Sequence, residues 1–304
     1  MKKRLIPITL VCVLVVSLCG CFGCGSSGEA SVSVGDLVEL AQESAKDIQS
    51  CNIEADVSME MSIPATQYSE AQEASMSLDL TGALDIPNEQ LQLVMNMDMP
   101  AEVTGTEMEG TISCYLVGDS IYLGMPGEES GSTEWMTMSM PNMNMISMMG
   151  LTEQQLTTMV TDLLACLESS ADIVVEGSEQ VKGVDCYYVE IDVNVAQLMN
   201  VATGITENPM IQGFAGDMGD SLAEIEEAVE SLTVTIWLAQ ETGLPMKVAI
   251  DTEIEIPMES MTIGADLVCE VTIFDYNQPA EVQVPQEAVD NAGPLMLGDL
   301  LGSS

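Results

Sequence analysis

The feature that most constrains the fold is a two-residue alternation of apolar and polar side chains along much of the chain. In residues 53–63 every odd position is apolar, and every even position is Glu, Asp or Ser. The same alternation returns in 76–80, 91–99, 112–116, 136–140, 234–238, 246–256 and 263–273. Successive side chains of a strand point to opposite faces of the sheet. The pattern therefore predicts antiparallel strands with one apolar and one polar face.

Three other segments space their apolar residues as an amphipathic helix does. They are Ser33 to Ile48, Thr152 to Leu167 and Ser221 to Leu232. Each starts with Ser or Thr three residues before Asp, Gln or Glu, which is a helix-capping pattern. Together with some ten or eleven strands, these helices predict an α+β fold. In that fold the helices cover the apolar face of one antiparallel sheet.

The first residues have the layout of an export signal. Lys2, Lys3 and Arg4 precede a 14-residue apolar run, Leu5 to Leu18. This run is too short to cross a membrane as a helix, which takes roughly 20 apolar residues. The sequence Leu-Cys-Gly-Cys that ends at Cys21 resembles the lipobox of bacterial lipoproteins. That resemblance implies that the thiol of Cys21 carries a diacylglyceryl group.

Two alternatives to lipidation of Cys21 remain open. Cys24 is the competing thiol, although Phe22 suits a small-residue cleavage site badly. An ordinary secretion signal that is cleaved without lipidation is the other. If Cys21 is the lipidated residue, residues 1–20 are a signal peptide and residues 21–33 form a lipidated, flexible tether. A single domain then covers 34–292, and 293–304 form a tail. The protein would be anchored on the extracytoplasmic face of a bacterial cell membrane.

The charge of the chain excludes several classes of function. After removal of residues 1–20, three lysines (Lys46, Lys182 and Lys247) stand against 49 acidic residues, a net charge of −46. Such a surface repels nucleic acid and anionic lipid headgroups. The chain has no histidine, so histidine-based catalysis and histidine-ligated zinc sites are excluded. We expect neither an enzyme nor a cofactor.

Nine cysteines suggest a disulfide framework at first, but their positions favour buried free thiols. Cys51, Cys114 and Cys269 fall on the apolar faces of predicted strands, and Cys166 falls on the apolar side of a predicted helix. A thiol in such a place behaves as a small hydrophobic side chain. Cys186 falls on a polar face, so a Cys166–Cys186 bridge remains open in an exported protein. No metal cluster is expected.

The order of several strand-turn-strand motifs resembles the LolA-like lipoprotein carriers, and more closely the LppX/LprG-type lipoproteins. The motifs are GDSIYL at 118–123, Trp135, VKGVDCYY at 181–188, WLAQETGLPMK at 237–247 and FDYNQPAEVQVP at 274–285. The resemblance implies a curved antiparallel half-barrel of about ten or eleven strands with amphipathic helices on its concave face. It also implies an acyl ligand sheltered between helices and sheet. The scarcity of basic residues departs from carriers of anionic lipids and favours a neutral cargo.

On this interpretation a methionine-rich face binds the ligand. The chain has 24 methionines, whose flexible thioethers suit a mobile acyl chain. The predicted cavity residues are Met59, Met61, Met95, Met97, Met99, Met136, Met138, Leu163 and Leu267. A membrane transporter or a cell-wall protein is the kind of partner that would exchange such a ligand.

Two other interpretations use the same residues. The helices could pack directly on this face, which would make the protein a surface-displayed interaction or signalling module with a filled core. Alternatively, the methionines between Met136 and Met149 could bind Cu(I), because thioethers are soft ligands. However, alternate positions of a strand lie roughly 6.6 Å apart, which is a poor start for closing on one ion.

Overall fold

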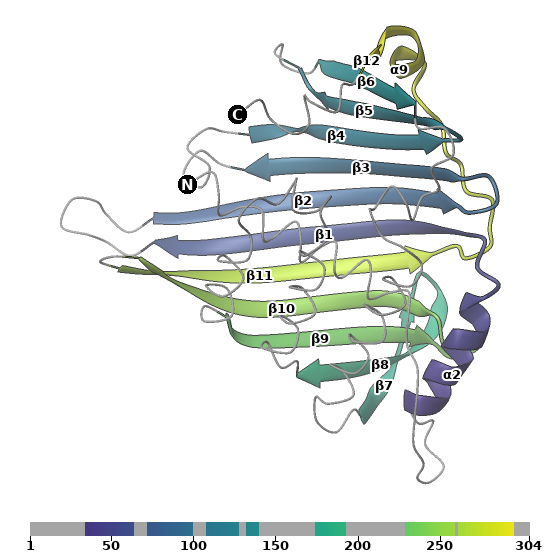
Figure 1. Ribbon diagram of the computed structural model, residues 1–304. Helices are drawn as coiled ribbons and strands as arrows, with labels where there is room; N and C mark the ends of the chain where they lie inside the picture. The colour runs from purple at the N-terminus through teal and green to yellow at the C-terminus, as the bar shows by residue number, and fades with distance from the viewer. Residues whose placement is uncertain are drawn as a thin grey trace. The chain divides into compact units, whose positions relative to one another are not determined.

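The computed structural model describes residues 34–63, 72–99, 108–127, 132–139, 174–192, 229–258 and 261–294. These residues form two helices, α2 (Val34–Ala45) and α9 (Gln286–Asn291), and twelve strands (Figure 1). The strands are β1 (Ser50–Ile63), β2 (Gln72–Asp85), β3 (Gln90–Met99), β4 (Met108–Val117), β5 (Ser120–Pro126), β6 (Thr133–Ser139), β7 (Val174–Val181), β8 (Val184–Asp192), β9 (Val229–Ala239), β10 (Pro245–Met258), β11 (Met261–Phe274) and β12 (Gly293–Pro294).

The hydrogen-bonded strand order is β12-β6-β5-β4-β3-β2-β1-β11-β10-β9-β8-β7. The two-residue strand β12 runs parallel to β6, whereas the pairings within β2–β6 and within β7–β11 are antiparallel. The chain divides into two compact units. Unit 1 comprises Met1–Asp47, Val57–Ser75 and Glu153–Thr272, and unit 2 comprises Ile48–Asp56, Met76–Thr152 and Ile273–Ser304.

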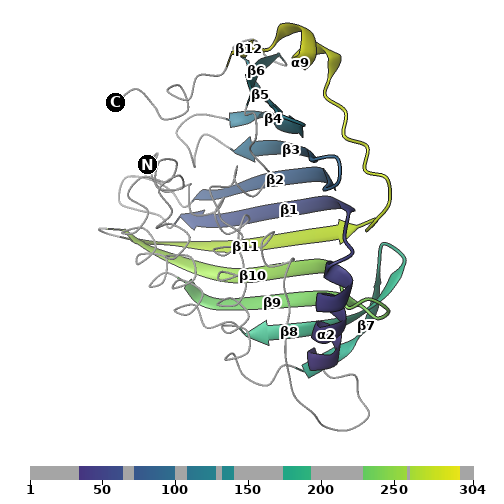
Figure 2. The same cartoon turned by 45° about the vertical axis from the view of Figure 1, so that its right-hand side comes forward.

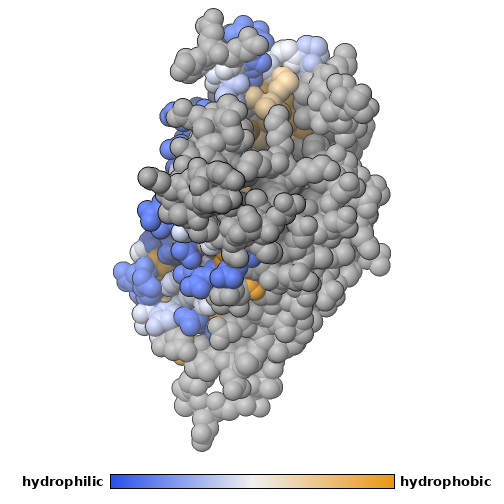
Figure 3. Space-filling view, turned by 90° about the vertical axis from the view of Figure 1, so that its left-hand side faces the viewer, coloured by the Kyte–Doolittle hydropathy of each residue, from blue (hydrophilic) through white to orange (hydrophobic). Residues whose placement is uncertain are grey.

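In unit 1 the centre of the apolar face of β9–β11 is buried. The pairing places Val248 opposite both Ile236 and Val271, and Ile250 opposite Cys269. Val248, Cys269 and Val271 are 0% exposed, and Ile236 is 2% exposed. The opposite face of β10 and β11 is acidic and exposed, since Asp251, Glu253, Glu255 and Asp266 lie there. Hydrophilic side chains of the described residues line the left margin of Figure 3.

Helix α2 packs at the turn between β9 and β10. Its residues Leu37 and Ala41 are buried. Gly243, in that turn, has a φ of +67°, and a Cβ atom there would collide with the backbone of Leu37 and Ala41. The close approach of helix and turn therefore requires glycine for two reasons, the backbone conformation and the space. Figure 2 shows α2 beside the ends of β8, β9 and β10.

The predicted α+β half-barrel, with amphipathic helices on its concave face, is wrong for the residues that the structure describes. These residues are nearly all strand, and no amphipathic helix lies across a face of the sheet. The first predicted helix exists, as α2, but it covers the β9–β10 turn instead. The helix predicted over 152–167 and residues 221–228 lie outside the described residues.

The last four residues of the third predicted helix are part of a strand. Val229 and Leu232, which fitted a helical stripe, belong to β9, and β9 pairs with both β8 and β10. Residues 233–236 are Thr, Val, Thr and Ile, all β-branched. Residues 229–232 pair with β10, and the β-branched run that follows pairs with β8 as well. These strand interactions outweigh a short match to the helical period.

Candidate functional site

The candidate site is the apolar face of β2–β6 in unit 2, which we call the methionine face. Strand register brings its side chains into rows that cross the strands. One row joins Leu93, Cys114, Leu123 and Met136, and the next joins Leu84, Leu91, Leu116, Ile121 and Met138. A third row places Met95 between Leu80 and Ile112. Five strands about 4.8 Å apart make this face roughly 19 Å wide.

The methionine face is only partly covered, in contrast to the apolar face of unit 1. Leu116 and Ile121 are buried. Met76 is buried as well, and Met125 is exposed. The other described apolar side chains of the face are half-buried, and they are Leu78, Leu80, Leu84, Leu91, Leu93, Met95, Met97, Ile112, Cys114, Leu123, Met136 and Met138. An apolar surface of this size that keeps part of its area in contact with water is typical of a binding surface.

Glycine shapes one end of the methionine face. A Cβ atom at Gly82 would lie 2.9 Å from the side chain of Leu93, on the neighbouring strand. The leucine side chain therefore occupies the space that a larger residue would fill. Gly82 and Leu93 are direct partners in the register.

The structure brings four of the predicted cavity residues onto the methionine face. Met95 and Met97 lie on β3, and Met136 and Met138 lie on β6. Met136 and Met138 are paired with Leu123 and Ile121, so their direct neighbours across the strand are hydrocarbon side chains. The strand interpretation of these two methionines is confirmed. Residues 140–149, which the copper interpretation needs, lie outside the described residues.

Of the remaining predicted cavity residues, three lie in unit 1. Met59 and Met61 belong to the part of β1 in unit 1, where Met59 is buried and Met61 half-buried. Leu267 lies on β11 in unit 1, opposite Thr252, and is 2% exposed. Met99 pairs with Met108 at the end of β3, and its side chain is outside the description. Leu163 and the lipidation candidate Cys21 also lie outside the described residues.

The described cysteines, Cys51, Cys114, Cys186 and Cys269, are free thiols. Burial raises the pKa of Cys51 to about 11, and it raises the pKa of Cys114 and Cys186 as well. Such thiols stay protonated and unreactive at neutral pH. Cys186 shares a face with Tyr188, as predicted, but it is 0% exposed and its thiol donates to the carbonyl of Val184. Cys166, its proposed bridge partner, lies outside the described residues.

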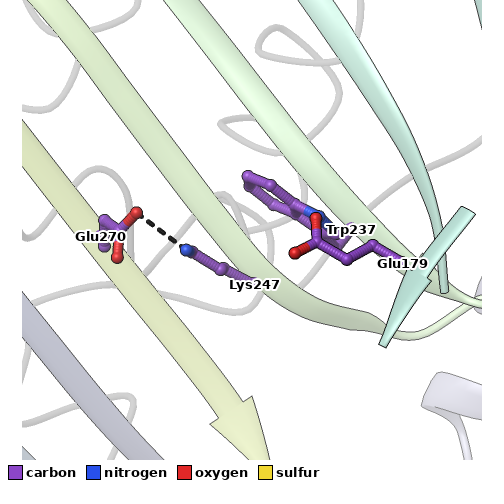
Figure 4. Close-up of polar contacts among 4 residues, drawn as sticks. All are labelled: Glu179, Trp237, Lys247 and Glu270. Carbon is purple, nitrogen blue, oxygen red and sulfur yellow. Dashed lines mark hydrogen bonds and ion pairs between the residues drawn. The ribbon is translucent and has the colours of Figure 1, made fainter. Parts of the chain in front are cut away.

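The polar face of unit 1 contains a small cluster around Trp237 (Figure 4). The indole N–H of Trp237 donates to Glu179 over 2.9 Å, and the Nζ atom of Lys247 lies 2.7 Å from a carboxylate oxygen of Glu270. The same ammonium group lies 4.8 Å from the centroid of the Trp237 ring. The charge of Lys247 is therefore neutralised locally, which leaves it poorly suited to hold an anionic ligand.

Sequence reasoning missed an aromatic pair on the other face of unit 2. Tyr115 and Trp135 have ring centroids 6.0 Å apart, and Tyr115 is 6% exposed. The Trp135 ring lies over Gly124, where a Cβ atom would be 2.8 Å from it. The sequence did contain a signal for this pair. The two-residue alternation of the strands places Tyr115, Gly124 and Trp135 on the face opposite the methionine face.

Neither a membrane-crossing helix nor a metal-binding group was found in the described residues. None of their helices is long and apolar enough to cross a membrane. Nor do these residues contain a group of three or more Cys, Asp or Glu side chains that could hold a metal ion. The acids of the polar faces are spread along the strands instead.

The family comparison matches most of the chain. The model of a protein family described as "Family of unknown function (DUF6612)" matches residues 33–293. The chain belongs to the DUF6612 family. No curated protein matches this DUF6612 sequence.

Several solved structures are similar to this DUF6612 chain at low identity. Lipoprotein LppX from Mycobacterium tuberculosis is 14% identical, with a TM-score of 0.39, and the match covers 84% of this chain and 100% of LppX. LprF from Mycobacterium bovis is 13% identical, with a TM-score of 0.38 and coverages of 85% and 99%.

The MucA/MucB complex of Pseudomonas aeruginosa gives a third match. It is 11% identical, with a TM-score of 0.30 and coverages of 84% and 62%. At these TM-scores the three likenesses support no transfer of function to the DUF6612 chain. The LolA-like resemblance stays a prediction.

Proposed function

We propose that this protein is a lipid-anchored, extracytoplasmic binding protein whose methionine face binds the acyl part of a neutral lipid. The observation that supports the proposal is the half-buried state of the apolar side chains on β2–β6. Unit 1 contains a comparable face whose central side chains are 3% exposed or less, namely Val248, Ile250, Leu267, Cys269 and Val271. The same chain thus buries one apolar face and leaves the other accessible.

Acyl binding fits the chemistry of this face. Methionine side chains have three rotatable bonds and a polarisable sulfur, so they adapt to a flexible hydrocarbon. Burying one methylene group gains about 0.8 kcal/mol, so eight methylenes would gain about 6 kcal/mol before the cost of ordering the chain. That amount is enough for reversible binding, which a carrier or sensor of lipid requires.

The charge distribution favours a neutral headgroup. The mature chain carries three lysines and no arginine. Of these lysines, Lys247 is paired with Glu270 and lies over Trp237. A phosphorylated headgroup would therefore approach a surface of net charge −46 without a cluster of cations to receive it. An uncharged acylglycerol or fatty alcohol is the better ligand class.

A matched pair of variants tests the binding face. Met95 is half-buried on the methionine face, and its neighbour Asn96 is exposed on the opposite face of β3. In a soluble form that lacks residues 1–24, we expect Met95→Lys to weaken binding of a fluorescent, uncharged acyl probe about tenfold, because it places a charge in the apolar site. Asn96→Lys adds the same charge and should leave the affinity within about twofold.

Native mass spectrometry of the same soluble form distinguishes the interaction module from the lipid binder. Co-purifying neutral lipid supports binding on the methionine face. A ligand-free protein with no affinity for the probe would contradict the proposal and favour the surface-displayed interaction module. Equal weakening by Met95→Lys and Asn96→Lys would place the probe elsewhere.

A further inference from the structure

After β11 the chain continues into unit 2 through a tightly bonded turn, residues 275–278. Asp275 and Asn277 have positive φ values of 54° and 60°. The backbone N–H of Asn277 donates to the carbonyl of Ser50 over 2.9 Å, and its side-chain oxygen accepts the N–H of Gln49 over 2.7 Å. The hydroxyl of Ser50 donates to the carbonyl of Gln278. We call this turn the latch.

Beyond the latch, residues 279–294 form a strap with few described attachments. The backbone N–H of Gln283 donates to the side-chain oxygen of Gln92 over 3.4 Å. Helix α9 has six residues, of which Ala288 is buried. The strap ends in β12, whose two residues pair in parallel with Met136 and Thr137 of β6. Figure 2 shows the strap running past the ends of β1–β3 to α9.

The strap is attached next to the aromatic pair, because Gln283 bonds Gln92 on the face of Tyr115 and β12 pairs with the two residues that follow Trp135. Gln92 lies opposite Tyr115 in the register, and Trp135 lies opposite Gly124, so all four belong to the same face. Tyr115 is buried there, and desolvation raises its pKa. The indole nitrogen of Trp135 is buried without a hydrogen-bond partner among the described residues. Burial of an unpaired donor costs free energy, which opening to water would recover.

We propose that residues 279–294 are a displaceable cover, hinged at the latch, which closes over Tyr115 and Trp135 and over the edge of β6. The latch provides a firm hinge because its hydrogen bonds join both backbone and side chains to the start of β1. The described attachments of the strap beyond the latch are a short helix, one long hydrogen bond and two paired residues, which lie next to the residue with the unpaired donor. When the strap lifts, β6 becomes an open strand edge and the indole N–H of Trp135 becomes available to a ligand or to water.

Two neighbouring residues of α9 provide a matched test in the full chain. Ala288 is 0% exposed and Val289 is 52% exposed. We expect Ala288→Glu to release the strap, because it buries a carboxylate, whereas Val289→Glu should leave it closed. The measurement is amide hydrogen exchange, in which the exchange rates of residues 288, 289 and 292 are compared with those of the amides in β4. In the unmodified protein these strap amides should exchange at least about tenfold faster than the β4 amides.

Fluorine NMR gives a second readout, since the chain has two tryptophans. With 5-fluorotryptophan incorporated, Ala288→Glu should shift the Trp135 signal toward its solvent-exposed position and leave Trp237 unchanged. Exchange of strap and β4 amides at the same rate in the unmodified protein would overturn the proposal. A Trp135 signal that does not move while the strap amides exchange freely would also overturn it.

A disulfide keeps the proposal testable if Ala288→Glu unfolds the whole unit. Thr137 and Pro294 are register partners, so Thr137→Cys with Pro294→Cys can join β6 to β12. Oxidation should slow exchange of the strap amides at least about tenfold, with no change in β4. If oxidation leaves the strap amides unchanged, strap motion at β6 does not control their exchange, and the proposal fails.

Discussion

At the residue scale, Gly243 shows how a single missing side chain positions an element. Its φ is +67°, and the backbone of Leu37 and Ala41 occupies the place of a Cβ atom. Gly183 provides a contrast, since its φ is +83° but no atom lies within 4 Å of the same position. A comparison of substitutions at the two glycines therefore distinguishes the free-energy cost of backbone strain from the cost of a steric clash with α2.

We expect Gly243→Ala to lower the free energy of unfolding by about 3 kcal/mol or more, since strain and collision with α2 add. Gly183→Ala should cost about 1 kcal/mol, from strain alone. Urea unfolding measures both values. Equal losses at the two positions would mean that α2 does not pack against the turn.

Buried thiols make the stability depend on alkaline pH. Burial raises the pKa of Cys51 from 9.0 to about 11. Between these values the unfolded chain releases the proton and the folded chain keeps it, so stability is full below pH 9 and falls as the pH rises toward 11. The loss for Cys51 is about 2 kcal/mol by pH 11. Cys51→Ala should flatten this part of a pH series of urea unfolding curves, and an unchanged slope would contradict the assignment.

Parity alone predicted the burial of two thiols, whereas Cys114, which was also predicted to be buried, is half-buried. Cys51 and Cys269 occupy apolar positions of alternating strands, and both are buried. The burial of Cys186 was not predictable, because this residue lies on the polar side of β8 and is nevertheless buried. The sequence specifies the face of a strand, but burial depends on which segments pack over that face.

At the element scale, strand pairing brings like charges together on the polar face of unit 1. Glu253 on β10 lies directly opposite Asp266 on β11. Both side chains are exposed. Directly opposed like charges destabilise a sheet. This pair also shows that a favourable apolar register can fix an unfavourable polar one, because a one-residue slip would turn the apolar side chains outward.

We expect Glu253→Lys to stabilise the protein by about 0.5–1 kcal/mol at low ionic strength, because it replaces repulsion from Asp266 by attraction. The gain should shrink in high salt, which screens exposed charges. Glu255→Lys, opposite Gly264, is the control and should gain less. Thermal unfolding in low and high salt measures both. A larger gain at Glu255 would contradict the register.

The long strands were more predictable than the helices and the short elements. Period-two alternation over ten or more residues specifies β1, β3, β10 and β11 well. Four residues at helical spacing did not specify a helix over Val229 and Leu232, because these residues pair with β10 and continue into a run that pairs on both sides. A two-residue strand such as β12 has no period to detect, so its pairing with β6 required the structure.

At the scale of the whole molecule, the methionine face is a product of register. The alternation places Met95, Met97, Met136 and Met138 on apolar faces, and the sequence analysis grouped them for that reason. It also grouped Met59, Met61 and Leu267 with them, which the structure assigns to unit 1. Alternation defines a face strand by strand, whereas strand order and burial decide which of those faces remain open.

The predicted anchor is testable on intact cells. We expect Cys21→Ser to abolish incorporation of an alkyne-labelled fatty acid, because the thiol is the acceptor, and to release the protein from the membrane fraction. Cys24→Ser should leave both unchanged. The measurement is in-gel fluorescence after coupling of the label, with fractionation. Loss of label in Cys24→Ser alone would move the anchor to that residue.

For a chain exported as proposed, the buried thiols have a consequence for folding. A chain that crosses a membrane unfolded presents its cysteines reduced to a compartment where oxidants form disulfides. Here the packed sheet shields Cys51, Cys186 and Cys269 once it has formed. Folding therefore has to be faster than oxidation of these thiols. A molecule that is oxidised before it folds forms a non-native disulfide. The yield of the native protein therefore depends on the folding rate relative to the oxidation rate, and not on equilibrium stability alone.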